Sequence, residues 1–439
     1  MLARLPRVTR AVAGLLAAAL ALAVAMPAAA EGDDVLVKLV VVSRHGVRTP
    51  LTGAAELAQW AAQPWPPGSD PPGALTPRGA QLTALVGRWY RDYAGLMAAL
   101  PAAGCPVPAT VYAFADATER TQATARAWLD GFAAQCNLPV RTRGAAGVDP
   151  LFHPVEAGVC PLDPMQAQTR VLERTGGDLN RITRDQKPQF AALQSVLDCC
   201  QPALCAAFGR GAACTLADLP TASTITPAGG LAVLGALPIA ASSAETLLLQ
   251  YLDGAPVADV GWGRATPERL REALRLHSAY FDLTQRTPYL ARRAGSALLY
   301  RVAAAVTSQR ALGFGPADPA VRDAKVVLYV GHDTNLWNLA ALLDVSWLQP
   351  TWQRNQTPPT GALVFEVHEG ADKKQRVYTS YVAPSLEQMR SATVLTLDAP
   401  PVRTPLRLAG CSSSAAGFPC TIEEFAVVLR NALDRDCLE

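Results

Sequence analysis

The sequence lacks a charge excess of either sign. Its 439 residues carry 39 lysines and arginines against 37 aspartates and glutamates, which gives a formal charge of +2. A nucleic-acid-binding protein is expected to carry a clear basic excess, so we expect no nucleic acid partner. Half of the residues are hydrophobic and only 17% are charged, which is typical of a packed globular protein and not of a disordered chain.

The chain also lacks the paired C-x-x-C motifs that hold structural zinc, and we expect no metal site. It has ten cysteines, and none of them lies in the first 30 residues. In an exported chain an even number of cysteines predicts disulfide bonds. Spacing alone leaves the pairing open, although short loops such as Cys205 to Cys214 and Cys411 to Cys420 are natural candidates.

Beyond the N-terminus the sequence has no apolar stretch long enough to span a membrane. Residues 1–30 combine three arginines with an alanine- and leucine-rich run that ends in the small-residue site Ala28-Ala29-Ala30. This pattern predicts a cleaved secretory signal peptide, with an uncleaved membrane anchor as the alternative. Cleavage removes three arginines and no acids, so the formal charge falls from +2 to −1. We therefore expect a periplasmic or secreted protein that has no membrane contact after cleavage.

Three continuous apolar runs predict buried strands of a parallel sheet. They are Val35–Val42, Val111–Ala115 and Val326–Val330. Between them, Thr76-Pro77 predicts the start of one helix, and Arg120–Phe132 has the pattern of another. Strands that alternate with helices indicate an α/β fold with a mainly parallel central sheet flanked by helices.

Residues 161–300 differ from the rest of the chain. Helical patterns dominate there, strand signals are scarce, and proline and glycine interrupt often. We expect an inserted, mainly helical cap domain, so that residues 31–160 and 301–439 form the α/β domain. Near the end of the chain, Ala362–His368 and Arg376–Val382 predict an antiparallel hairpin.

A polar cluster follows each predicted strand. Ser43–Arg48 follows the first strand, Asp116–Thr121 the second, and Gly331–Asn335 the third. Ligands of open α/β sheets bind beyond the carboxyl ends of the strands, so we expect the three clusters to meet in one site.

The clusters combine the groups that phosphoryl transfer requires. Arg44, Arg48 and Arg120 supply planar, permanently charged donors that match phosphate oxygens. Cationic neighbours would lower the pKa of His45 and keep its lone pair available for nucleophilic attack. Asp333 could protonate the leaving oxygen if a bound phosphate raises the pKa of this carboxyl group.

Each cluster also has a structural interpretation. Arg120 could be a surface helix residue, and Asp116 could simply stabilise a helix N-terminus. His45 and His332 differ from the other histidines because both end buried strands beside polar partners. We interpret the remaining histidines as structural: His153, His277 and His368.

Two of these clusters resemble family signatures. The segment Arg44–Pro50 is similar to the R-H-G-x-R-x-P signature of the histidine acid phosphatases, and His332–Asn335 resembles their H-D-x-N signature. Asp116–Thr121 is similar to the segment that supplies a third phosphate-binding arginine. The resemblance covers almost all of the chain beyond residue 30, and it points to the bacterial branch of phytases and glucose-1-phosphatases.

The resemblance implies a role for each candidate residue. His45 would be the nucleophile that forms a phosphohistidine, and Asp333 would protonate the leaving group and then assist the attack of water. No metal or other cofactor would take part. The implied fold is an α/β sheet domain with a helical domain beside the cleft. The residues implied to bind the substrate are Arg44, Arg48, Arg120, His332 and Glu245.

The resemblance also implies four disulfide bonds. Cys199 and Cys200 stand outside this pattern and are expected to form either a vicinal disulfide or two free thiols. The implied pairs are Cys105–Cys136, Cys160–Cys437, Cys205–Cys214 and Cys411–Cys420.

We expect a monomeric acid phosphomonoesterase that acts on a small-molecule substrate, myo-inositol hexakisphosphate (phytate). Thr334 favours the phytase branch, which reads H-D-T-N, over the glucose-1-phosphatase branch, which tends to read H-D-S-N. The alternative is a glucose-1-phosphatase or a broad-specificity sugar-phosphate phosphatase. The export signal argues against a phosphomutase, and the presence of both a nucleophile and an acid argues against a non-catalytic binding protein.

Overall fold

The computed structural model describes residues 34–66, 71–95, 100–101, 103–143, 148–226, 230–307 and 318–438. The expected signal peptide, residues 1–30, lies outside these ranges. Within them, no helix has the length and apolarity that a bilayer crossing requires.

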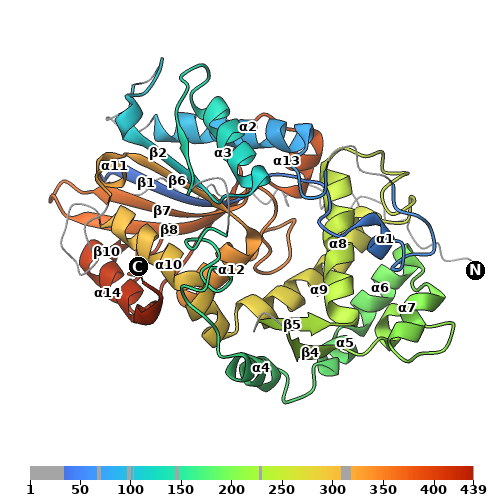
Figure 1. The fold of residues 1–439 in the computed structure, drawn as a ribbon. Coiled ribbons are helices and arrows are strands. Elements are labelled where there is room, and N and C mark those ends of the chain that lie inside the picture. The colour runs from blue at the N-terminus through green and yellow to red at the C-terminus, as the bar shows by residue number, and fades with distance from the viewer. Residues whose placement is uncertain are drawn as a thin grey trace, which may run out of the picture.

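An eight-stranded mixed sheet forms the centre of the α/β part (Figure 1), with the strand order β10-β8-β7-β1-β6-β2-β3 and with β9 paired to β8. The central strands β1, β6, β2 and β3 are parallel, and the hairpin β7–β8 continues the sheet in antiparallel fashion. The predicted fold class, strands and hairpin are confirmed. The strand bounds are β1 Val35–Arg44, β2 Val111–Ala115, β3 Val140–Arg141, β6 Val326–Gly331, β7 Ala362–Glu369, β8 Gln375–Ala383, β9 Val402–Pro405 and β10 Cys420–Thr421.

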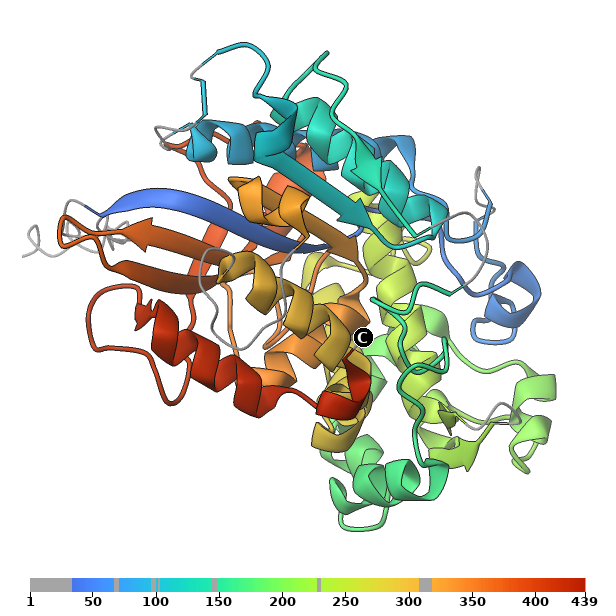
Figure 2. The same cartoon turned by 60° about the vertical axis from the view of Figure 1, so that its left-hand side comes forward.

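Helices cover both faces of the sheet (Figures 1 and 2). A hydrophobic core lies on each face of the sheet. Alternate residues of β1 pack into one core or the other, because successive side chains of a strand point to opposite faces. Leu39 and Val41 pack in the core beneath α2 and α3, whereas Val40 and Val42 pack in the core of α10, α12 and α14. The helix bounds are α2 Pro77–Ala94, α3 Glu119–Phe132, α10 Pro288–Val306, α11 Pro319–Asp323, α12 Asp333–Leu342, α13 Leu386–Ser391 and α14 Ile422–Ala432.

The start of α2 supports the loop that follows β1. Thr76 caps the helix by accepting a hydrogen bond from the Gly79 backbone N–H, and Pro77 is the first helical residue, as predicted. A Cβ atom at Gly79 would lie 2.0 Å from the carbonyl oxygen of Val47, so only glycine allows the helix to pack this closely. The loop that carries His45 therefore rests directly on the first turn of α2.

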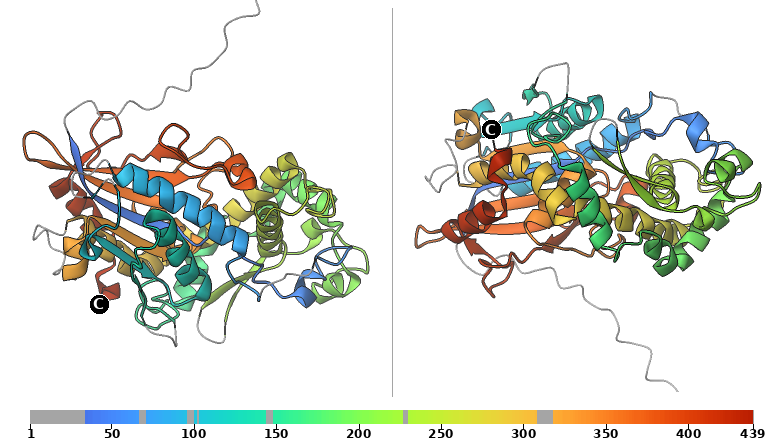
Figure 3. Two further views of the ribbon diagram at one scale, coloured as in Figure 1. Left: turned by 90° about the horizontal axis from the view of Figure 1, so that it is seen from above. Right: turned by 60° about the horizontal axis from the view of Figure 1, so that its bottom comes forward.

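A second group of helices has its own hydrophobic core (Figure 3). Most of it falls within residues 161–300, and it includes one small hairpin, β4 Ala222–Ile225 with β5 Leu231–Leu234. The expected boundary near residue 300 falls inside α10, whose Leu298 and Leu299 pack in the sheet core. We propose that the cap ends before α10. Its helices are α4 Pro164–Glu173, α5 Asn180–Asp185, α6 Lys187–Leu197, α7 Pro202–Ala207, α8 Ala236–Leu252 and α9 Pro267–Gln285. The short helix α1 Ala54–Leu57, from an earlier part of the chain, packs in the same core.

Five disulfide bonds include every cysteine of the chain. The four pairs implied by the family resemblance are confirmed, and the remaining two neighbours, Cys199 and Cys200, form a vicinal disulfide. The four confirmed pairs are Cys105–Cys136, Cys160–Cys437, Cys205–Cys214 and Cys411–Cys420.

Candidate active site

The three polar clusters meet at the carboxyl ends of β1, β6 and β2, as predicted. The backbone N–H of His45 donates to the Gly331 carbonyl at 2.9 Å, and that of Asp116 donates to the Val330 carbonyl at 3.0 Å. The loops that leave the three strands are therefore held side by side. The imidazole centroids of His45 and His332 lie 5.5 Å apart.

His45 is buried and held as a neutral imidazole. Its Nδ1 lies 2.8 Å from the Gly46 carbonyl oxygen, which can only accept, so Nδ1 carries the proton and Nε2 keeps a lone pair. Burial, and then the charges of Arg44 and Arg48, hold the pKa of His45 well below its ordinary value. An unprotonated Nε2 beside cationic groups is what a nucleophile towards phosphorus needs.

Two arginines of the first motif surround this imidazole. Arg44 is 1% exposed, donates from Nη1 to the Thr357 carbonyl at 2.6 Å, and pairs through Nη2 with Glu245 and with Asp333 at 3.0 Å. Arg48 is also buried, and burial lowers its pKa to about 10. Two carboxylates thus compensate the Arg44 charge in a site where an unpaired charge would be costly.

The buried Nε atoms of Arg44, Arg48 and Arg120 donate no hydrogen bond within the described part of the chain. A buried donor without a partner is unfavourable by about 1–3 kcal/mol. The charges of all three arginines act on His45, so the surroundings of this imidazole suit an anion.

The two carboxylates reach the site from different parts of the chain. Asp333 begins α12, and Glu245 lies in the middle of α8, 201 residues after Arg44. Burial raises the pKa of Asp333, but the opposing charges of Arg44, His277 and Arg48 outweigh it and leave the pKa at about 2. Asp333 is therefore ionised in this structure.

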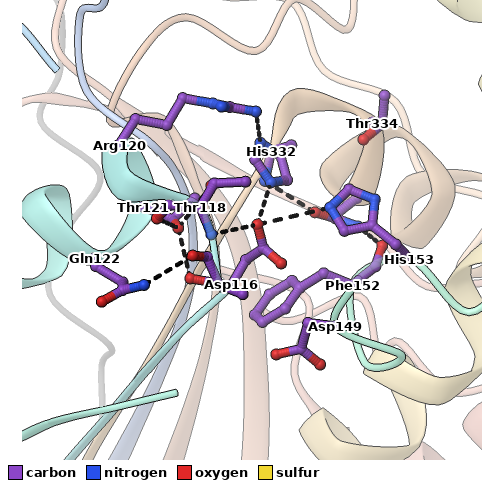
Figure 4. Close-up of polar contacts among 12 residues, drawn as sticks. Asp116, Thr118, Arg120, Thr121, Gln122, Asp149, Phe152, His153, His332 and Thr334 are labelled. Atoms are coloured by element: carbon purple, nitrogen blue, oxygen red, sulfur yellow. Dashed lines mark hydrogen bonds and ion pairs between the residues drawn. The ribbon is translucent and has the colours of Figure 1, made fainter. Parts of the chain in front are cut away.

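His332 is fixed between a cation and an anion (Figure 4). Its Nε2 donates to the Asp116 carboxylate at 2.9 Å, and its Nδ1 lies 3.2 Å from Arg120 Nη2, which must be the donor. Burial, together with Arg120, lowers the pKa of His332, although Asp116 opposes this shift. Asn335 accepts from the His332 backbone N–H at 2.9 Å and so holds the motif in place.

For several residues, the contacts in the structure differ from the interpretation that we gave them from the sequence. Asp116 is the hydrogen-bond partner of His332 and not only a residue near a helix start. His153 and His277, interpreted as structural, lie at the site: His153 Nε2 is 3.7 Å from Asp116, and His277 Nε2 is 3.7 Å from Glu245. Nothing in the local sequence pattern of either histidine marks it, because the contacts are long-range. His368 lies on the distant hairpin beside Glu366.

Comparison with known proteins agrees with this geometry. The sequence pattern of the histidine phosphatase superfamily (branch 2) matches residues 35–383. Phytase AppA of Escherichia coli strain K12 is 34% identical over 411 residues, which cover 92% of this chain and 94% of that protein. Glucose-1-phosphatase of Salmonella typhimurium strain LT2 is 30% identical, over 95% of this chain and 98% of that protein.

A solved structure agrees as well. The structure of Hafnia alvei phytase in complex with myo-inositol hexakis sulphate has a TM-score of 0.84 and 32% sequence identity, over 92% of this chain and 98% of that one. The fold, the paired motifs and these relatives lead to one conclusion. The chain belongs to the histidine phosphatase superfamily, branch 2, the family of the histidine acid phosphatases.

Proposed function

We propose that the protein is an acid phosphatase that hydrolyses phytate through a phosphohistidine on His45. The observation that carries this proposal is the buried, neutral imidazole of His45, on which the charges of Arg44, Arg48 and Arg120 act. The Nε donors of these arginines have no partner within the described residues. A phosphate group would satisfy these donors, and its phosphorus atom would then lie within reach of His45 Nε2.

The first step forms the bond between His45 Nε2 and phosphorus and breaks the ester bond to the leaving oxygen. Asp333 donates a proton to that oxygen, so the leaving group departs as an alcohol. In the second step a water molecule attacks phosphorus, the Asp333 carboxylate takes a proton from it, and the bond to His45 breaks. The phosphate charge is balanced throughout by Arg44, Arg48 and Arg120.

His332 suits phosphate only in its protonated form. With Nε2–H donating to Asp116, its Nδ1 lone pair would face the phosphate oxygens, which are also acceptors. A proton on Nδ1 turns this repulsion into a charge-assisted hydrogen bond. Because the pKa of His332 lies below its ordinary value, we expect substrate binding to favour acidic conditions.

The choice of phytate rests on the relatives. The E. coli phytase is 34% identical, against 30% for the Salmonella glucose-1-phosphatase. We propose that Glu245 contacts the substrate through Oε2, because Oε1 is engaged by Arg44 and Oε2 accepts no hydrogen bond within the described residues. A periplasmic or secreted location is proposed from residues 1–30 and is consistent with the five disulfide bonds.

The test is phosphate release at acidic pH from phytate, glucose 1-phosphate and an aryl phosphate, with His45→Ala as the inactive control. We expect the highest kcat/KM for phytate, and rapid acid-free quenching should trap a phosphohistidine in the wild type only. Activity that survives in His45→Ala would overturn the mechanism. A higher kcat/KM for glucose 1-phosphate would favour the alternative, a glucose-1-phosphatase.

A further inference from the structure

Three potential metal ligands lie together behind the phosphate pocket. Asp116 Oδ2 is 2.9 Å from His332 Nε2 and 3.7 Å from His153 Nε2, and the three ligand atoms all lie within 4.8 Å of one another. Figure 4 shows contacts from the Asp116 carboxylate to the imidazoles of both His332 and His153. The mechanism proposed above uses His332 but gives His153 no part.

These distances fit a tetrahedral ion. Zinc bonds of about 2.0–2.1 Å to nitrogen and oxygen place neighbouring ligand atoms about 3.3 Å apart, and the two observed distances from Asp116 lie on either side of that value. The third distance, between the ligand nitrogens of the two histidines, lies within 4.8 Å, so His153 must approach His332 by up to about 1.5 Å to complete the three-ligand set. Two imidazoles and one carboxylate leave a fourth position of the ion open.

The surrounding structure holds the two histidines together. Asn335 accepts from the His332 backbone N–H and donates to the Phe152 carbonyl at 2.8 Å, so one side chain ties the His153 loop to the H-D-T-N motif. Asp149 is buried nearby, and its Oδ2 accepts no hydrogen bond within the described residues.

We propose that Asp116, His153 and His332 form a binding site for Zn²⁺. Zinc at His332 Nε2 moves the ring proton to Nδ1, where it opposes the Arg120 N–H that points at that atom from 3.2 Å, so Arg120 must turn away from His332. His153, which is 28% exposed, provides the side from which the ion enters.

The binding test uses Co²⁺ as a spectroscopic substitute for zinc on the intact, disulfide-bonded protein. At about pH 7, above the ordinary histidine pKa of about 6.5, we expect one Co²⁺ per chain and the visible bands of tetrahedral Co²⁺. His153→Asn should weaken binding at least about tenfold, as loss of even a supporting group does at metal sites. His368→Asn, on the distant hairpin, is the matched control and should bind as the wild type does. Absence of stoichiometric binding, or equal binding by His153→Asn, overturns the site.

Discussion

The substitution Asp333→Asn tests the proposed general acid. Asparagine has nearly the same shape as aspartate but cannot deliver a proton. In this structure the Asp333 pKa is about 2, because Arg44 Nη2 lies 3.0 Å from its carboxylate and outweighs the effect of burial. An acid with such a pKa would be ionised at any pH at which an acid phosphatase works, so the substrate itself must raise it.

The size of that increase follows from the position of the phosphate. A phosphate held by Arg44 would lie about 4 Å from the Asp333 carboxylate, where one negative charge acts with about 4 kcal/mol at an effective dielectric constant of 20. This energy corresponds to about three pKa units. Substrate binding would therefore raise the Asp333 pKa from about 2 to about 5, and the group could then donate a proton under acidic conditions.

The assay compares two leaving groups and two kinetic constants. Asp333→Asn should slow phosphorylation of the enzyme by phytate by about 10²- to 10⁴-fold, and far less for an activated aryl phosphate that needs no proton. In the wild type, kcat for phytate should fall above about pH 5, since kcat reports groups of the enzyme–substrate complex. This decline should be absent in the variant. The exposed carboxylate Asp398 supplies the control, Asp398→Asn, which should behave as the wild type.

Two results would refute this reasoning. Equal losses for phytate and the aryl phosphate would show that Asp333 does not act on the leaving group. An unchanged decline of kcat with pH in Asp333→Asn would show that another group controls it.

Three further predictions concern the support of the site and of the fold. Asp116→Asn should move the alkaline decline of kcat/KM to lower pH, because the Asp116 carboxylate raises the pKa of His332 and activity needs His332 protonated; a shift to higher pH would contradict this role. Replacing both cysteines of the Cys160–Cys437 bridge with serine should lower the free energy of unfolding by about 2–5 kcal/mol in urea titrations. The loss should exceed that for the Cys411–Cys420 bridge, whose sequence separation is 9, because the Cys160–Cys437 bridge has a sequence separation of 277. Gly79→Ala should lower the melting temperature and kcat together, since its Cβ would lie 2.0 Å from a carbonyl of the nucleophile loop; an unchanged melting temperature would show that α2 can shift freely.

The residues at the strand ends were predictable because their signal is local. An apolar run followed at once by charged residues marks the end of a buried strand, and parallel strands bring their carboxyl ends to one edge. For this reason Arg44, His45, Arg120, His332 and Asp333 were expected together, and the structure places them together.

The partners of these residues were not predictable in the same way. Glu245 reaches Arg44 across 201 residues, and Asp116 reaches His332 across 216. His153 was interpreted as structural because a single histidine in a loop has no periodic pattern. The hydrogen bond from Asn335 to the Phe152 carbonyl helps to hold its loop beside Asp116.

The sequence by itself predicted the candidate chemistry of the protein: an imidazole between two arginines, an acid just after a second strand, and the family to which the two motifs belong. Neighbouring residues are enough to recognise each motif, because each one consists of a strand end and the segment that follows it. Only the tertiary structure decided the protonation of these groups. Their pKa values depend on burial and on charges that include His277 of α9 and His153, and packing of distant segments brings these together.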